Sequence, residues 1–184
     1  PVPKISGFDK KVTMRKGITA ALSRSWKEIP HYFLRTEVDM TRTTERLSQE
    51  NKSRTIQDRM ITAPLFIKAT AIALKESPEF NGFYLNGEFQ KGSGIHIGFA
   101  IALREEGLIA PAIRECDGKD LNTLMKNVND LVERTRNLNL KGSEMTDATI
   151  TITSLGDLGV DTVFGIIYPP QVALVGFGSI HEKA

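Results

Sequence analysis

Apolar residues recur every three or four positions between residues 14 and 29, which is the spacing of one face of an α-helix. This stripe predicts a helix that Pro30 ends, because proline lacks the backbone N–H that a helix interior needs. A more polar helix is expected next, capped by Thr41 and running to about Gln57. The residues of the stripe are Met14, Ile18, Leu22, Trp26 and Ile29.

Two later stretches predict more apolar helices. The first is capped by Thr62, tolerates Pro64 in its first turn and ends at residues 77–78. Its composition predicts burial around most of the helix circumference. The second opens at Asp120 and has one apolar face. The apolar residues are Ala69, Ala71, Ile72, Ala73 and Leu74 in the first helix, and Leu121, Leu124, Met125, Val128, Leu131, Val132 and Leu138 in the second.

Alternating and continuous apolar runs predict strands. Residues 31–40 (HYFLRTEVDM) alternate between apolar and polar side chains and predict one strand. Residues 83–90 (FYLNGEFQ) predict a hairpin, because Asn86-Gly87 supplies the two positive-φ residues of a type I′ turn. Further strands are expected in residues 95–103 and 108–115, joined by a turn around Gly107, and in residues 148–160 and 171–180.

This order of elements contains no regular strand–helix–strand repeat and no internal duplication. It predicts a mixed α/β sandwich with helices packed on one face of the sheet. The residues before the first helix are polar and predict an N-terminal arm or linker end over residues 1–12. No linker interrupts residues 13–184, so one domain is expected there. The length of 184 residues, with 40% hydrophobic side chains, suffices for a core without disulfides or metal.

The balance of charge changes this picture little. There are 24 basic and 22 acidic residues, so no strong field favours nucleic acid. Cys116 is the single cysteine and forms no internal disulfide.

No apolar run approaches the roughly 20 residues of a membrane span, and the first residues do not form a signal peptide. Because the chain begins at Pro1 rather than Met, we expect a processed product or a piece of a longer protein, located in the cytoplasm or an organelle matrix.

The sequence contains few of the common catalytic motifs. The three histidines, His31, His96 and His181, match no metal-ligand spacing. Residues 92–98 (GSGIHIG) miss both the dinucleotide and the P-loop patterns, and no G-x-S-x-G motif occurs. Cys116 has no histidine near it in sequence and is expected to be a strand-end residue rather than a nucleophile.

Two of the histidines have structural interpretations. His31 lies at a helix-to-strand junction, where we expect it to satisfy a local backbone carbonyl. His96 alternates with two isoleucines and is expected on the face opposite to them.

The stretch 148–160 (ATITITSLGDLGV) carries an unusual number of hydroxyls. Its alternation predicts a strand with Ile150 and Ile152 on the packed face. Thr149, Thr151 and Thr153 then lie on the other face. A polar strand face followed by a glycine turn is the plain interpretation, and a segment that presents hydroxyls to a ligand is the functional one.

Five segments of the chain match one family in the correct order and cover about residues 12 to 178. They are MRKGITAALSRSWKEIPHYFLRTEVDMT, PLFIKATAIALKESPEFNGFY, HIGFAIALREEGLIAPAI, TITITSLGDLGV and FGIIYPPQVALVGFG. With these segments the chain resembles the catalytic core domain of the 2-oxo acid dehydrogenase dihydrolipoamide acyltransferases.

The resemblance implies a chloramphenicol-acetyltransferase-like fold, trimers with active sites at subunit interfaces, and a channel that admits coenzyme A and the lipoyl arm from opposite ends. It implies acyl transfer between dihydrolipoamide and coenzyme A, with a histidine as general base and a hydroxyl as oxyanion donor. A base helps because a thiol with a pKa of about 8.5 is only partly ionised at neutral pH. The implied partners are further copies of the chain in a homotrimer or larger cage, a lipoyl domain, and the dehydrogenase and dihydrolipoamide dehydrogenase components.

Aligned with the family pattern, TITSLG places the oxyanion hydroxyl at Thr153, where the family usually has serine. Threonine keeps the donor, but its methyl group restricts χ1. The resemblance also implies that Ser154, Gly156, Val163 and Phe164 contact coenzyme A or lipoamide, with no metal. Gly156 and Gly159 would let the backbone turn close to the path of the thioester.

The base histidine of the family lies in an H-x-x-x-D-G motif, which residues 1–184 do not contain, so we expect it beyond Ala184. Three interpretations follow: part of an active enzyme, a catalytically silent scaffold of the same fold, or a stand-alone acyltransferase with another acceptor. No lipoyl-bearing segment is present, so the lipoyl arm is expected from a longer precursor or another chain. Candidate subunit contacts are the arm through Lys16, residues 164–170 and the edge of the sheet.

Overall fold

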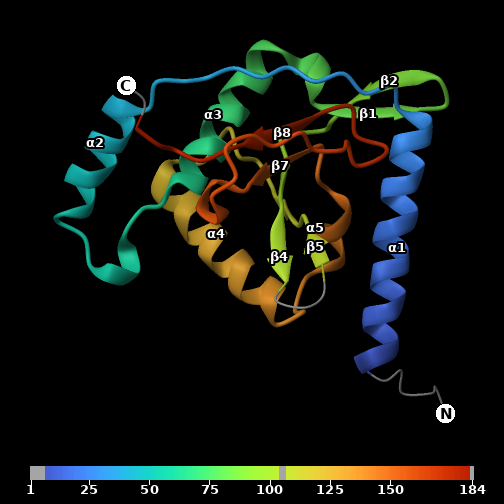
Figure 1. Ribbon diagram of the computed structural model, residues 1–184, viewed down its shortest axis with the longest axis horizontal. Coiled ribbons are helices and arrows are strands. Elements are labelled where there is room, and N and C mark those ends of the chain that lie inside the picture. The colour runs from blue at the N-terminus through green and yellow to red at the C-terminus, as the bar shows by residue number, and fades with distance from the viewer. Residues whose placement is uncertain (1–6, 104–106, 183–184) are drawn as a thin grey trace.

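The computed structural model describes residues 7–103 and 107–182, and its helices surround a small mixed sheet (Figure 1). The α-helices are α1 (Gly7–Glu28), α2 (Thr41–Asn51), α3 (Thr62–Glu76), α4 (Leu121–Arg136) and α5 (Gly142–Thr146). Short 3₁₀-helices are η1 (Ile56–Asp58), η2 (Pro78–Phe80) and η3 (Gly156–Leu158). The strands are β1 (Gly82–Leu85), β2 (Glu88–Lys91), β3 (Ile97–Phe99), β4 (Ile101–Leu103), β5 (Gly107–Ile109), β6 (Ala112–Ile113), β7 (Ile150–Ser154) and β8 (Leu174–Phe177).

The main sheet has the strand order β6-β3-β7-β8. β7 lies between β3 and β8 and runs parallel to both, whereas β6 runs antiparallel to β3. β1–β2 and β4–β5 form separate antiparallel pairs. The hydroxyl-rich stretch therefore supplies an interior strand of the sheet, and the expected mixed α/β class is confirmed.

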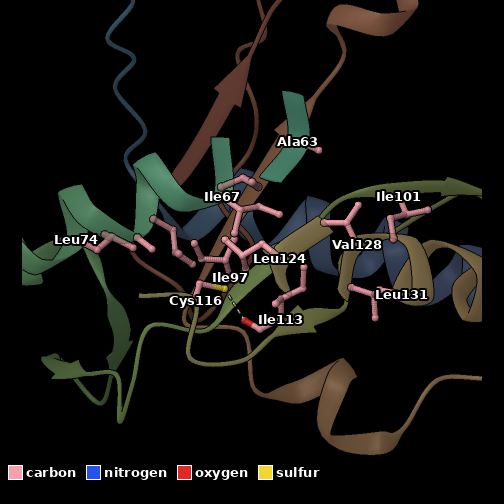
Figure 2. Packing of buried hydrophobic residues seen from close by; sticks show 13 residues of the cluster. Ala63, Ile67, Leu74, Ile97, Ile101, Ile113, Cys116, Leu124, Val128 and Leu131 are labelled. Carbon is pink, nitrogen blue, oxygen red and sulfur yellow. Dashed lines mark hydrogen bonds between the residues drawn. The ribbon is translucent and has the colours of Figure 1, made fainter. Parts of the chain in front are cut away.

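One face of the sheet packs against α3 and α4 (Figure 2). Ile67 of α3 and Leu124 of α4 meet Ile97 of β3 there, and all three side chains are fully buried. Burying an isoleucine or leucine stabilises a fold by roughly 1.5–3 kcal/mol, so this cluster is the main apolar core. Its members are Ala63, Ile67, Ala71, Leu74, Ile97, Ile101, Ile113, Cys116, Leu124, Val128, Leu131, Ile150 and Ile152.

Local turn and cap signals gave several correct boundaries. Asn86 and Gly87 have φ of 54° and 86°, and they connect β1 to β2 as the Asn-Gly pair predicts. Asp120 caps α4, since its carboxylate accepts a hydrogen bond of 2.7 Å from the Thr123 N–H. Leu138 was expected on the apolar face of this helix, but it lies beyond the helix end and is exposed.

The two other expected caps are wrong. Thr62 is the first residue of α3, and neither it nor the preceding residue caps the helix through a side chain. Thr41 is likewise inside α2, and its N–H donates to the Asp39 carboxylate over 2.9 Å. Hydrogen bonding from the Thr41 side chain, and then from its backbone N–H, holds the pKa of Asp39 below its ordinary value. α2 also ends at Asn51 rather than near Gln57.

Helix α3 is buried on one face only. Its inward residues include Ile67 and Ala71, whereas Ala69, Ile72 and Ala73 are exposed in this chain. The expectation of burial around most of its circumference is therefore wrong. Apolar composition did not distinguish a helix enclosed by this chain from one with an open apolar face.

Residues 31–40 form no strand, contrary to expectation. They run between α1 and α2 along one side of the molecule (Figure 1), and most of their side chains are exposed. A strand needs a neighbour for its backbone hydrogen bonds, and the described part of this chain offers none here. The alternation of apolar and polar residues is present without that neighbour.

Helix α1 begins at Gly7, so the expected irregular arm is helical from that residue onward. Among its side chains that the structure describes, Ser25 is the only fully buried one. Ile18 is half-buried, and Leu22 and Trp26 are exposed. The inward face is therefore centred on a serine and not on the predicted apolar stripe.

Candidate functional site

The site is built on β7, whose side chains alternate as predicted. Ile150 and Ile152 enter the apolar core. Thr149, Thr151 and Thr153 lie on the other face and are only 2%, 5% and 8% exposed. The threonine face is thus covered by protein, so each hydroxyl needs a partner or an open space to reach.

Two of these hydroxyls serve the fold. Thr149 Oγ1 lies 2.6 Å from Asn81 Oδ1 and accepts a hydrogen bond from the His96 N–H. Thr151 donates to Gln171 Oε1 over 2.8 Å, and the amide of Gln171 donates to the Ala148 carbonyl. These bonds attach the loops around Asn81 and Gln171 to the central strand.

The third hydroxyl is different. Within the described part of the chain, no hydrogen bond engages the side chain of Thr153, and its oxygen is not a sealed, unsatisfied atom. Thr153 stands opposite Gly176 in the register of β7 and β8. A glycine there leaves no side chain beside the hydroxyl, which therefore remains able to donate to a ligand.

The backbone turns directly after Thr153. The Leu155 N–H still donates to the Phe177 carbonyl, and η3 is followed by Gly159, which has a φ of 76°. Gly156 fits against Gly178 so closely that a Cβ would stand 2.5 Å from the Gly178 carbonyl oxygen. Both glycines are required by the turn, one for its conformation and one for close approach.

Of the other expected binding residues, Val163 lies against β8. A Cβ on Gly176 would stand 2.9 Å from the Val163 carbonyl oxygen, so residue 163 covers β8 beside Thr153. Phe164 is exposed and packs edge-on against Phe33, with ring centroids 5.5 Å apart. Ser154 is half-buried at the end of β7.

The histidines have other contacts. His31 Nδ1–H donates to the Ile29 carbonyl over 2.8 Å, which confirms the expected backbone role. His96 Nδ1 accepts from the Glu115 N–H, and His181 lies near Ser179 and Asp161. Through residues 7–103 and 107–182, no histidine contacts Thr153.

Cys116 is fully buried, and its thiol donates to the Ile113 carbonyl over 3.0 Å (Figure 2). Burial raises the pKa of this thiol to about 11, so it is protonated at neutral pH. Cys116 lies in the turn after β6 and packs in the apolar core, so it is not at the end of a strand as expected. No group of three or more His, Cys, Asp or Glu that suits a metal ion occurs among the described residues, and no described helix combines the length and apolarity needed to cross a membrane.

Sequence reasoning missed one set of contacts near the site. Ser25 and His31 both bond the backbone of Ile167, more than 130 residues away. The available signal was the position of Ser25, seven residues after Ile18 and four before Ile29, on the inward face of α1.

Comparison with known proteins shows to which family the chain belongs. The sequence model of the 2-oxoacid dehydrogenases acyltransferase catalytic domain matches residues 9–184, and the chain belongs to this family. One relative is the dihydrolipoyllysine-residue acetyltransferase component of the mitochondrial pyruvate dehydrogenase complex of Dictyostelium discoideum. It is 31% identical over 170 residues, which are 92% of this chain and 26% of that protein. The chain spans less than half the length of the curated relatives it matches.

Two solved structures have the same fold, which confirms the expected fold class. The dihydrolipoamide acetyltransferase of Azotobacter vinelandii, studied for the role of a serine, a histidine and an asparagine in its catalytic mechanism, is 31% identical with a TM-score of 0.85. The cubic core of a pyruvate dehydrogenase multienzyme complex is 29% identical with a TM-score of 0.86. Each similarity covers 100% of this chain and 79% of the other chain.

Proposed function

We propose that this chain is the catalytic core of a dihydrolipoamide acyltransferase, which moves an acyl group between dihydrolipoamide and coenzyme A. The observation that carries the proposal is the Thr153 hydroxyl. It lies at the end of the interior strand and has no partner in the described chain, and the family of the chain is an acyltransferase family.

In the proposed reaction, the thiol of one substrate attacks the thioester carbonyl of the other. A new C–S bond forms, the carbonyl oxygen becomes an oxyanion, and the Thr153 hydroxyl donates a hydrogen bond to it. Collapse of this intermediate breaks the old C–S bond, and the proton removed from the attacking thiol passes to the leaving thiolate. A donor already aimed at the oxyanion contributes roughly 3–4 kcal/mol to such a step.

The general base is assigned to a histidine outside residues 1–184. In support, the contacts of His31, His96 and His181 lie elsewhere in the described structure. A serine and a histidine were studied together in the mechanism of the Azotobacter acetyltransferase. Thr153 is assigned to the place of that serine.

Ser154, Gly156, Val163 and Phe164 are assigned to the path of coenzyme A or the lipoyl arm. Support comes from the position of Val163 over β8, beside the register partner of Thr153. Gly156 adds no side chain at the turn, and Phe164 offers an exposed ring. The step as written uses no metal.

The proposed partners are other copies of this chain in a trimer or larger cage, a lipoyl domain, and the dehydrogenase and dihydrolipoamide dehydrogenase components. The cubic core among the similar structures supports self-assembly. The proposed location is the mitochondrial matrix, which the mitochondrial Dictyostelium relative supports. If the source is bacterial, the proposed location is the cytoplasm.

The test is transfer of an acetyl or branched acyl group from acyl-CoA to dihydrolipoamide by the full-length protein. Thr153→Ala should lower kcat by roughly ten- to a thousand-fold with assembly intact, because the oxyanion loses its donor. Thr153→Ser should keep most of the rate. Thr151→Ala is the matched control on the same strand face, and it should lower stability without lowering kcat.

Full activity of Thr153→Ala would show that the oxyanion assignment is wrong. A wild-type protein that transfers neither acyl group would overturn the proposed activity itself.

A further inference from the structure

The end of α1 and the residues just after it are attached to the loop before β8 through the backbone of one residue, Ile167. Ser25 Oγ donates to the Ile167 carbonyl over 2.5 Å, and the Ile167 N–H donates to His31 Nε2 over 3.0 Å. Both polar groups of Ile167 are therefore bonded by residues 136 and 142 positions earlier in the chain. We call these two bonds the Ile167 clasp.

The hydrogen bond of His31 Nδ1 determines that Nε2 acts as an acceptor in the clasp. Nδ1–H donates to the Ile29 carbonyl, so Nε2 of the neutral ring has a lone pair for the Ile167 N–H. Ser25 Oγ lies 3.5 Å from the same Nε2. These contacts orient the ring in one tautomer and direct it at the loop.

The burial pattern of α1 shows that the clasp is a specific contact. Ser25 has 0% exposed surface, whereas Leu22 and Trp26 on the same helix are exposed. A buried hydroxyl costs free energy unless it is hydrogen-bonded, and Ser25 meets that condition through Ile167.

The clasped loop is the one that carries two proposed substrate-binding residues. Residues 162–168 have no regular secondary structure, so helix or sheet hydrogen bonds do not hold them. Val163 of this loop covers Gly176, and Gly176 is the register partner of Thr153. On the other side, Phe164 meets Phe33, which follows His31 by two residues and stacks against its ring.

We propose that Ser25 and His31 are positioning residues for acyl transfer, which fix the loop 162–168 over β8 and beside Thr153 by bonding the backbone carbonyl and N–H of Ile167. This inference rests on the proposed function. Neither side chain takes part in the chemistry, and both act through the loop. Acyl transfer requires the thioester to be held close to its productive position relative to the donor, and a misplacement of about 1 Å already slows the step, so a loosened loop lowers the rate.

Three variants of the full-length protein test the clasp. His31→Gln retains an acceptor near the Nε2 position, whereas His31→Asn retains only the donor toward Ile29. Ser25→Ala removes the other bond and leaves a smaller side chain that the helix accommodates. The control is His96→Asn, the same substitution at a histidine whose contact with the Glu115 N–H lies away from the loop.

We expect His31→Asn and Ser25→Ala each to lower kcat by ten-fold or more, at a temperature where the variants are folded, with His31→Gln close to wild type. The double variant should lose little more than the worse single variant, because both changes release the same loop residue, Ile167. Hydrogen exchange of the Ile167 amide should accelerate at least ten-fold in His31→Asn and stay slow in His96→Asn.

A kcat for His31→Asn within two-fold of wild type, in a wild-type protein that is active, overturns the positioning role alone. Equal losses of activity in His31→Asn and His96→Asn, each following the unfolded fraction, overturn it as well. An inactive wild type overturns the proposed function and the positioning role together, and the exchange of the Ile167 amide still shows whether the clasp forms.

Discussion

Three threonines on one strand face have different tasks, and their partners determine which one is available for chemistry. Thr149 and Thr151 donate to side chains from Asn81 and Gln171, whereas Thr153 has no such bond in the described structure. Sequence alternation placed all three on the same face but does not show which hydroxyls are bonded. The resemblance of TITSLG to the family pattern selected Thr153, and the hydrogen bonds of its neighbours leave it as the free donor.

The partners of the clasp illustrate what a sequence does not show. The helix period of α1 places Ser25 inward, but the residue it bonds lies 142 positions later. A hydrogen bond across that separation leaves no local pattern, because neither serine nor isoleucine is unusual in its own segment. His31 was correctly assigned to a backbone carbonyl, whereas its second bond, from Ile167, was not predicted.

A second residue-scale feature is the pair formed by Arg134 and Glu144. Two guanidinium nitrogens contact the two carboxylate oxygens over 2.7 Å, and the side chains are 23% and 14% exposed. The hydrogen bonds from Arg134 hold the pKa of the Glu144 carboxyl below its ordinary value. Such a group contributes stability above its unfolded pKa of about 4.3, and loses it as the pH falls through the folded pKa.

We therefore expect Arg134→Met to lower the free energy of unfolding at pH 7 by about 1–3 kcal/mol, because Glu144 keeps its burial and loses its charged partner. The loss should shrink in acid, where wild type also gives up this contribution. Denaturant unfolding at pH 7 and at about pH 3 measures both. Arg24→Met, which breaks the exposed pair with Glu28, is the control and should cost less than about 1 kcal/mol. Equal losses from the two variants would contradict the argument.

At the scale of elements, the accuracy of prediction followed the range of the signal. The Asn86-Gly87 turn, the stop at Pro30 and the Asp120 cap are each set by a few adjacent residues, and the structure has them where expected. The strand expected at residues 31–40 failed because pairing depends on a distant neighbour. Burial of α3 was overestimated for the same reason, since an apolar residue does not specify which chain covers it.

Helix α3 offers a test of which face is structural. Ile67 is fully buried between α4 and the sheet (Figure 2), whereas Ile72 on the same helix is half exposed. Ile67→Ala should lower the free energy of unfolding by about 2–5 kcal/mol, because it removes core contacts and leaves a cavity. Ile72→Ala should change it by less than about 1 kcal/mol, since alanine favours the helix and little buried area is lost. Denaturant unfolding compares the two, and similar losses would refute the assigned inward face.

At the scale of the whole molecule, the sheet with α3 and α4 forms an enclosed core, and the N-terminal part lies outside it. α1 and α2 stand on opposite sides of the molecule, and residues 29–40 run between them (Figure 1). No residue of α2 is buried, and only Ser25 is fully buried among the described side chains of α1. Many large apolar side chains of this N-terminal part are exposed. A protein seldom leaves such a surface open to water, so the arrangement favours contact with another chain.

The exposed segment 31–40 gives that expectation a specific form. Tyr32, Leu34 and Val38 share one side of an extended chain and are 76%, 84% and 67% exposed. The segment has the alternation of a strand and lacks a strand neighbour in the described chain, which is the condition in which one chain pairs with another. We therefore predict that residues 31–40 lie in a contact between copies of this chain.

The test replaces Leu34 and Val38 together by aspartate, because a carboxylate buried at a contact between copies loses its hydration. The double variant should fall from the oligomeric mass of wild type to that of one chain by light scattering, with its far-ultraviolet circular dichroism unchanged. Ile56→Asp, which adds one carboxylate at an equally exposed position in η1, should keep the oligomeric mass. A wild-type protein with the mass of a single chain would contradict the assembly, and a double variant that keeps the oligomeric mass would exclude residues 31–40 from the contact.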